Sequence, residues 1–103
     1  MLSQKSLEFI KEIGEKHGVQ RIVLFGSCLH LPEAEAGDID LAVGGLDAET
    51  FVEMWNDLTW APELHMKNVD LVRMEDALPV MVMVRAEGVT IYECERERAT
   101  VSA

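Results

Sequence analysis

Basic residues are scarce in this chain, and their scarcity limits what it can bind. The sequence holds nine Lys and Arg residues against nineteen Asp and Glu residues, which gives a net charge of −10 at pH 7. Proteins that bind nucleic acids or anionic membranes rely largely on Lys and Arg contacts to phosphates. We therefore expect no direct nucleic-acid partner and no membrane partner, whereas a basic protein would complement this surface.

Long apolar runs and clustered cysteines are also missing. The longest apolar stretch, residues 77–84, is about half the length of a membrane span and is interrupted by Pro79. The N-terminus carries charges throughout and lacks the apolar segment of a signal peptide. Cys28 and Cys94 do not have the spacing of a metal site or of a disulfide scaffold. The sequence therefore predicts a cytoplasmic protein with reduced thiols.

The length of the chain fits one small domain. Its 103 residues are enough for a single hydrophobic core and too few for a second lobe. We assign the domain to residues 1–94. The last nine residues, 95–103, show no apolar periodicity, so we expect a disordered C-terminal tail there.

Segments with the periodicity of helices alternate with segments that favour strands. A first helix is expected to end at Gly18. A second is expected after a favourable N-cap at Asp47, with Trp55 on its apolar stripe, and a third from residues 75–76 to Glu87. Four stretches rich in β-branched and aromatic residues are expected to be strands: 21–26, 38–43, 69–72 and 89–93. This alternation predicts an α/β or α+β domain, with helices packed on one face of a mixed sheet of about four strands.

Two aspartates interrupt the second expected strand, where an interior face would normally be apolar. Residues i and i+2 of a strand project from the same face about 6.5–7 Å apart, so Asp38 and Asp40 stand side by side. Asp70, in the strand at 69–72, joins them if the two strands are neighbours. Clustered carboxylates repel one another and acquire raised pKa values unless a cation keeps them ionised. Such an open set of oxygen ligands suits Mg²⁺, which usually shares its coordination shell with substrate phosphates.

A glycine–serine pair ends the strand that precedes these carboxylates. Gly26 lets the backbone approach a ligand closely, and a helix N-terminus after it would aim N–H groups at an anion. Ser27 adds a hydroxyl donor. A phosphate-binding turn that faces a carboxylate–metal cluster is the arrangement that phosphoryl or nucleotidyl transfer requires, commonly with two metal ions.

The order and spacing of these residues resemble a known signature. Gly26 and Ser27, ten further residues, Asp38-Ile39-Asp40 and a later Asp70 are similar to the GSx10DxD pattern of the nucleotidyltransferase superfamily related to DNA polymerase beta. The resemblance extends along nearly the whole chain, to AEGVTIYE at residues 86–93. Within that superfamily the chain looks like the minimal nucleotidyltransferases, or MNT proteins, which implies a polymerase beta-like fold.

What the resemblance implies is an antitoxin that uses ATP. Small proteins of this kind are typically encoded beside HEPN-domain ribonuclease toxins and silence them by transferring AMP from ATP to a tyrosine. The implied partner is a HEPN-domain toxin in a hetero-oligomer, and the implied cofactor is Mg²⁺, as two ions. Carried over to this sequence, Gly26 and Ser27 would bind the triphosphate. Asp38, Asp40 and Asp70 would be the catalytic metal ligands, and Asp70 also a base for the incoming hydroxyl.

The chain departs from the family directly after the serine. Many members continue with a run of the type Arg-x-Arg-Gly, whereas residues 28–31 here are Cys, Leu, His and Leu. The missing basic residues leave open a non-catalytic antitoxin that acts by complex formation alone. A small-molecule nucleotidyltransferase is a third hypothesis, although such enzymes generally carry an extra helical domain. The apolar segment 78–84 is expected either in the core or against another chain.

Overall fold

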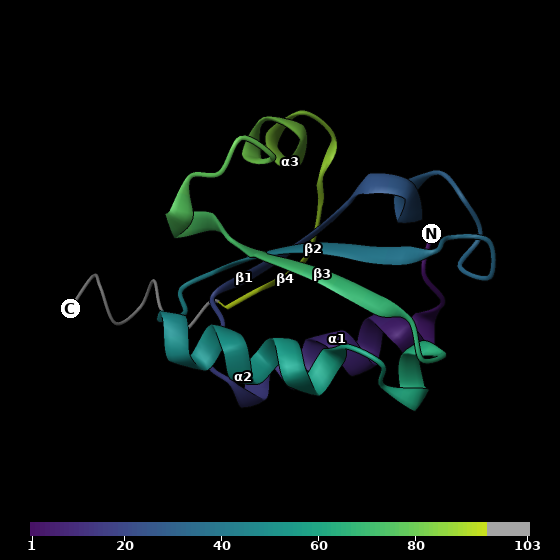
Figure 1. Cartoon of the computed structure of the whole chain (residues 1–103), viewed down its shortest axis with the longest axis horizontal. Helices are drawn as coiled ribbons and strands as arrows, with labels where there is room; N and C mark the ends of the chain where they lie inside the picture. The colour runs from purple at the N-terminus through teal and green to yellow at the C-terminus, as the bar shows by residue number, and fades with distance from the viewer. Residues whose placement is uncertain (95–103) are drawn as a thin grey trace.

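The sheet at the centre of the molecule has four strands in the order β3-β2-β1-β4 (Figure 1). The computed structural model describes residues 1–94. Its strands are β1 (Arg21–Phe25), β2 (Asp38–Gly44), β3 (Asn68–Arg73) and β4 (Val89–Glu93). β1 runs antiparallel to both β2 and β4, whereas β2 and β3 run parallel to each other. The expected mixed sheet is confirmed, and each strand end lies within one residue of its expected position.

Two helices cover one face of this sheet, the lower face in Figure 1: α1 (Gln4–Lys16) and α2 (Ala48–Leu58). Each helix begins at a side chain that satisfies a free backbone N–H group. Ser3 accepts a hydrogen bond from the Ser6 amide at 3.2 Å. Asp47, the expected N-cap, accepts one from the Thr50 amide at 2.8 Å. Such caps typically stabilise a helix by about 1 kcal/mol, so both helix starts are set locally by sequence.

The main hydrophobic core lies between these two helices and the sheet. Its largest side chains without solvent exposure are Ile10, Ile22, Leu24, Ile39, Leu41, Met54, Leu58 and Leu64. They come from α1, α2, β1, β2 and the 3₁₀ turn η2 (Pro62–Leu64). Burial of one such side chain stabilises the fold by roughly 1.5–3 kcal/mol. This layer therefore supplies most of the stabilisation, and the opposite face of the sheet is left for a site.

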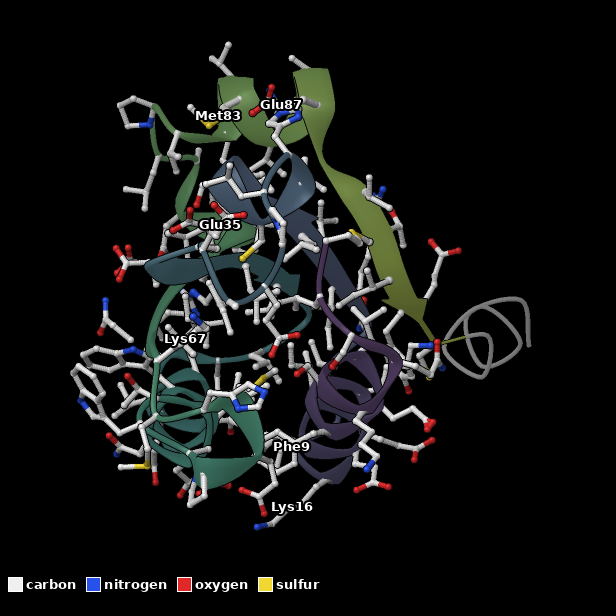
Figure 2. The ribbon with its side chains drawn as sticks, turned by 90° about the vertical axis from the view of Figure 1, so that its right-hand side faces the viewer. Phe9, Lys16, Glu35, Lys67, Met83 and Glu87 are labelled. Carbon is white, nitrogen blue, oxygen red and sulfur yellow. The ribbon has the colours of Figure 1, made fainter. Side chains whose placement is uncertain are left out.

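The third helix, α3 (Met81–Glu87), lies on that opposite face, so the expectation that all helices share one face is wrong. Figure 2 shows Met83 of α3 above the sheet and Phe9 of α1 below it. A second, smaller apolar cluster joins α3 to the sheet and contains Val23, Phe25, Ala42, Met81 and Val84. Apolar residues occupy only part of this face, and a short helix is enough to cover them.

α3 also begins later than the sequence predicted. The acidic residues at 75–76 lie in a 3₁₀ turn, η3 (Met74–Asp76), and do not start the helix. Ala77 then adopts a left-handed conformation with a φ of +50°, which is incompatible with a continuing right-handed helix. The chain becomes α-helical only at Met81, beyond Pro79.

The expected tail at residues 95–103 lies outside the described residues, so the division of the chain at residue 94 stays a prediction. Within residues 1–94, none of the helices is long and apolar enough to cross a membrane.

Candidate active site

Asp40 and Asp70 occupy directly paired positions on the parallel strands β2 and β3. Asp38 lies two residues before Asp40 on the same strand and therefore on the same face, the one opposite α1 and α2. In the antiparallel pairing of β2 with β1, Asp40 lies opposite Phe25, the residue before Gly26. The fold thus gathers the three aspartates and the glycine–serine turn at one end of one face of the sheet.

The three carboxylates influence one another electrostatically. Asp40 is partly buried, whereas Asp38 and Asp70 are exposed. Burial raises the pKa of Asp40 from 3.8 to about 6, with further contributions from the charge of Asp70, a hydrogen bond with Asp70 and the charge of Asp38. Asp40 and Asp70 thus face each other across the two strands, and Asp38 is close enough for its charge to act on Asp40.

The donor set at this point fits a hard divalent cation. Carboxylate oxygens are the ligands that Mg²⁺ prefers, and its charge would remove the repulsion that helps to raise the pKa of Asp40. Among residues 1–94, no three Asp, Glu, His or Cys side chains are already arranged as a metal site. The carboxylates have the chemistry to hold a cation, and rotation of the exposed Asp38 and Asp70 side chains would be needed to converge on it.

Gly26 packs directly against the Asp40 carboxylate. Its φ of +78° lies in the left-handed region, and a Cβ at this position would collide with Oδ2 of Asp40. The residues from here on form a single 3₁₀ turn, η1 (Gly26–Leu29), so the expected helix after the pair is only one turn long. Ser27 is exposed at the start of this turn. Only glycine allows the backbone and the carboxylate to lie this close together.

Cys28 has a structural place that the sequence did not indicate. It is fully buried, and its Sγ donates a hydrogen bond to the backbone carbonyl of Asp38 at 3.3 Å. Burial raises the pKa of the Cys28 thiol, and the charge of Asp40 adds to this effect. Cys28 therefore ties the glycine–serine turn to the start of β2. His30, two residues later, is exposed to solvent.

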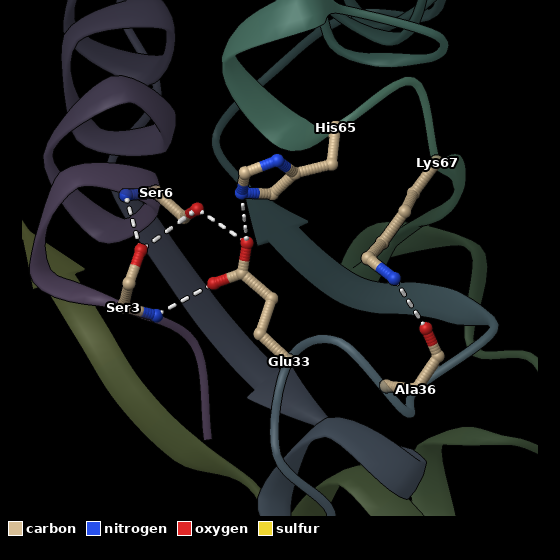
Figure 3. Close-up of polar contacts among 6 residues, drawn as sticks. All are labelled: Ser3, Ser6, Glu33, Ala36, His65 and Lys67. Carbon is tan, nitrogen blue, oxygen red and sulfur yellow. Dashed lines mark hydrogen bonds and ion pairs between the residues drawn. The ribbon is translucent and has the colours of Figure 1, made fainter.

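Glu33 anchors the loop that joins the glycine–serine turn to β2, although sequence patterns did not single it out. Its carboxylate accepts hydrogen bonds from the Ser3 amide at 2.7 Å and the Ser6 hydroxyl at 2.8 Å (Figure 3). It also pairs with Nε2 of His65 at 3.1 Å. Burial by itself would raise the pKa of Glu33, but the hydrogen bonds from Ser3 and Ser6 outweigh it and lower the pKa.

Two further contacts fix the same loop from outside. Lys67 donates to the backbone carbonyl of Ala36 at 2.7 Å, as Figure 3 shows. The N-terminal amine of Met1 donates to the carbonyl of Leu31, also at 2.7 Å. Together with the contacts of Glu33, they fix the loop between the Gly26–Ser27 turn and Asp38 at Leu31, Glu33 and Ala36. Tertiary contacts therefore fix where the Gly26–Ser27 turn lies relative to Asp38 and Asp40. A local sequence pattern does not reveal these contacts.

A groove of about 350 Å³ begins at the carboxylates and crosses the free edge of β3. Its lining comes from both faces of the sheet, from α2 and from the segment before α3: Phe25, Asp40, Phe51, Trp55, Asp70, Leu71, Val72 and Val80. Sequence reasoning missed the aromatic part of this lining. Helical spacing predicted Trp55 in the core, but 42% of it is exposed, because it borders the buried stripe of α2 at the sheet edge.

Comparison with known proteins finds a family that matches most of this chain. The family described as Polymerase beta, Nucleotidyltransferase matches residues 8–97. A solved complex of a tri-AMPylated Shewanella oneidensis HEPN toxin with MNT antitoxin contains a chain 26% identical to this one, with a TM-score of 0.66. That match covers 94% of this chain and 77% of the other.

Two related crystal structures give the same result. The toxin–antitoxin MntA–HepT matches with 26% identity and a TM-score of 0.66, over 92% of this chain and 76% of the other. A mutant toxin–antitoxin complex in which two aspartates, two positions apart, are replaced by glutamate matches with 25% identity and a TM-score of 0.69, over 88% and 76%. No protein of curated function matches the sequence. The polymerase beta-like fold expected from the sequence is confirmed.

Proposed function

We propose that this chain, which belongs to the Polymerase beta, Nucleotidyltransferase family, is an antitoxin. In this proposal it transfers AMP from ATP to a tyrosine of a HEPN-domain toxin. The solved complex of a tri-AMPylated HEPN toxin with its MNT antitoxin, 26% identical over most of both chains, supports the reaction and the partner. The observation that supports the site is the pairing of Asp40 with Asp70 directly beside Gly26.

In the proposed reaction, the phenolic oxygen of the acceptor tyrosine attacks the α-phosphorus of ATP. A new O–P bond forms, the bond from this phosphorus to the oxygen shared with the β-phosphate breaks, and pyrophosphate leaves with that oxygen. The phenolic proton is released, and AMP remains on the tyrosine as a phosphodiester. Bound Mg²⁺ would supply charge neutralisation for the phosphates and a lower pKa for the attacking hydroxyl.

The residues of the chain would position the reactants and carry no covalent intermediate. At Gly26 the backbone would approach the triphosphate, and Ser27 would donate its hydroxyl to a phosphate oxygen. Asp38, Asp40 and Asp70 would hold Mg²⁺ through their carboxylate oxygens. Asp70, the member of the set on the edge strand, would accept the proton of the incoming hydroxyl.

One observation favours the second candidate function, neutralisation by complex formation alone. The position directly after Ser27 is filled by a buried cysteine, and no Lys or Arg lines the groove in the part of the chain that the structure describes. Neither the turn itself nor the adjacent groove therefore carries the basic residues that the motif usually has. No comparable observation favours a small-molecule acceptor.

Incubation of the purified chain with its HEPN partner, Mg²⁺ and radiolabelled ATP tests the proposal. We expect label on a tyrosine of the partner, loss of transfer on chelation of the metal, and loss in the variant Asp40→Asn. Asp57→Asn is the matched control, because Asp57 lies on α2 on the far side of the sheet. Toxin activity is measured in parallel. If the wild-type chain silences the toxin without any label, and Asp40→Asn does so equally well, binding alone is the function.

A further inference from the structure

The groove beside the carboxylates is formed at a sheet edge where α2 and the residue after it already bond both backbone groups of Val69. At this edge the indole N–H of Trp55 donates to the backbone carbonyl of Val69 at 2.8 Å. The Val69 amide in turn donates to the Thr59 hydroxyl at 3.3 Å. The indole bond fixes the Trp55 ring against β3 while 42% of the residue stays exposed. An apolar or aromatic group can therefore pack on this indole without breaking a hydrogen bond.

The order of the strands separates the two ends of the proposed reaction. Gly26 follows β1 and Asp70 lies on β3, with Asp40 on β2 between them. In an in-line displacement the nucleophile approaches the α-phosphorus from the side opposite the departing pyrophosphate. With the triphosphate at the turn after β1, the attacking hydroxyl must arrive across β3. The groove opens over that strand.

We propose that this groove is the acceptor subsite, and that it receives the phenol ring of the modified tyrosine between Trp55 of α2 and the segment before α3. This inference rests on the proposed function, because it assumes that AMP goes to a tyrosine. Phe51 and Leu71 add apolar side chains to the lining, and Asp70 supplies a carboxylate to it. An amphipathic phenol suits this combination, with its ring on apolar side chains and its hydroxyl toward a carboxylate.

The surroundings of the groove favour a protein acceptor over a small molecule. Val80 connects the groove to α3, where Val82 and Met83 keep 72% and 46% of their area exposed. Leu78, just before Val80, is 41% exposed. A chain that places a tyrosine in the groove would cover these apolar residues at the same time. Exposed apolar residues gathered next to a substrate groove are typical of a surface that another protein covers.

Steady-state transfer of AMP to the HEPN partner, with each substrate varied in turn, tests the acceptor subsite. We expect Trp55→Ala to raise the KM for the HEPN protein by about three- to tenfold, the range of one aromatic pair, and to leave the KM for ATP unchanged. Trp55→Phe keeps an aromatic face and should retain most of the wild-type value. Trp60→Ala is the matched control, because Trp60 is 57% exposed but does not line the groove.

The possible outcomes separate the two proposals. A KM for ATP that rises in Trp55→Ala would place the nucleobase in the groove and overturn the acceptor assignment. Unchanged KM values for both substrates would overturn it as well, with the proposed function intact. If the wild-type chain transfers no AMP to the partner, the proposed function fails and the subsite fails with it. Should Trp55→Ala not fold, as judged by circular dichroism, Trp55→Leu replaces it with the same expectation.

Discussion

Replacement of Gly26 by alanine tests whether contact between the turn and the Asp40 carboxylate is required for activity. The new Cβ would meet Oδ2 of Asp40, and the φ of +78° would be imposed on an L-residue. The backbone conformation alone costs an L-residue about 1–2 kcal/mol, which lowers the Tm of a domain of this size by roughly 5–15 °C. Because the carboxylate must also turn away, we expect AMP transfer to fall at least about 100-fold.

Gly18→Ala is a matched control within the same chain. Gly18 has almost the same backbone conformation, with a φ of +77°, but nothing lies within 4 Å of a Cβ added there. We expect Gly18→Ala to lower the Tm by a similar amount, because the backbone conformation is equally unfavourable for an L-residue. We expect the rate of AMP transfer to stay unchanged. Thermal melts monitored by circular dichroism and transfer assays at a temperature where both variants are folded make the comparison. Folded Gly26→Ala protein that transfers AMP as fast as Gly18→Ala would refute the argument.

Three further perturbations follow from the charges and burial around the site. The raised pKa of Asp40, about 6, means that its charge opposes folding above that pH and that folding gains stability as pH falls from 6 toward 3.8. At pH 7 without divalent cations, Asp40→Asn should therefore raise the free energy of unfolding by about 1 kcal/mol, measured by urea titration. This is less than the whole pKa shift would give, because solvent screens the partly exposed carboxylate. Glu33→Gln should lower the free energy of unfolding by about 1–3 kcal/mol, because the amide keeps only one accepting oxygen and carries no charge to strengthen its hydrogen bonds; the exposed Glu63→Gln is the control. The pKa of Glu33 is lowered, so the wild-type protein should lose this contribution as pH falls below the ordinary value of 4.5, whereas Glu33→Gln should not. Finally, Cys28 should resist iodoacetamide at pH 8 until the protein is unfolded, because the thiol is buried and its pKa is raised. Peptide mass spectrometry separates it from the less buried Cys94, and rapid labelling of Cys28 itself in the native protein would contradict its burial.

The parts of the site that the sequence predicted are those that depend on local geometry. Alternation along 38–43 places Asp38 and Asp40 on one face whatever the neighbouring strands do. The N-cap at Asp47 and all four strands likewise follow from short-range preferences, whereas the N-cap at Ser3 was not predicted. The position of Asp70 required one further assumption, that its strand lies beside β2. The register shows that it does, with Asp40 and Asp70 directly paired.

The parts that could not be predicted depend on contacts between distant segments. The topology of the sheet determines that β3 is an edge strand. Trp55 packs at that edge and is therefore exposed in a groove, although its helical spacing suggested the core. Glu33 looks like an ordinary loop carboxylate until the loop folds back on the start of α1. The late start of α3 follows from the left-handed Ala77, which the acidic residues before it do not reveal. Each of these misses concerns a residue whose partner lies far along the chain or whose backbone breaks a local rule.

The acidic character of the chain bears directly on how ATP would be held. Three carboxylates lie on the face of the sheet beside the proposed phosphate-binding turn, the residue after Ser27 is a buried cysteine, and the described lining of the adjacent groove contains no basic side chain. A triphosphate placed there meets charge of its own sign, and an added cation is the direct way to make that contact favourable. We expect further positive charge to come from the partner, because a chain with a net charge of −10 attracts a basic surface at long range. The charge imbalance that makes a nucleic-acid substrate unexpected thus favours a site completed by metal ions and by a basic protein seated over β3 and α3.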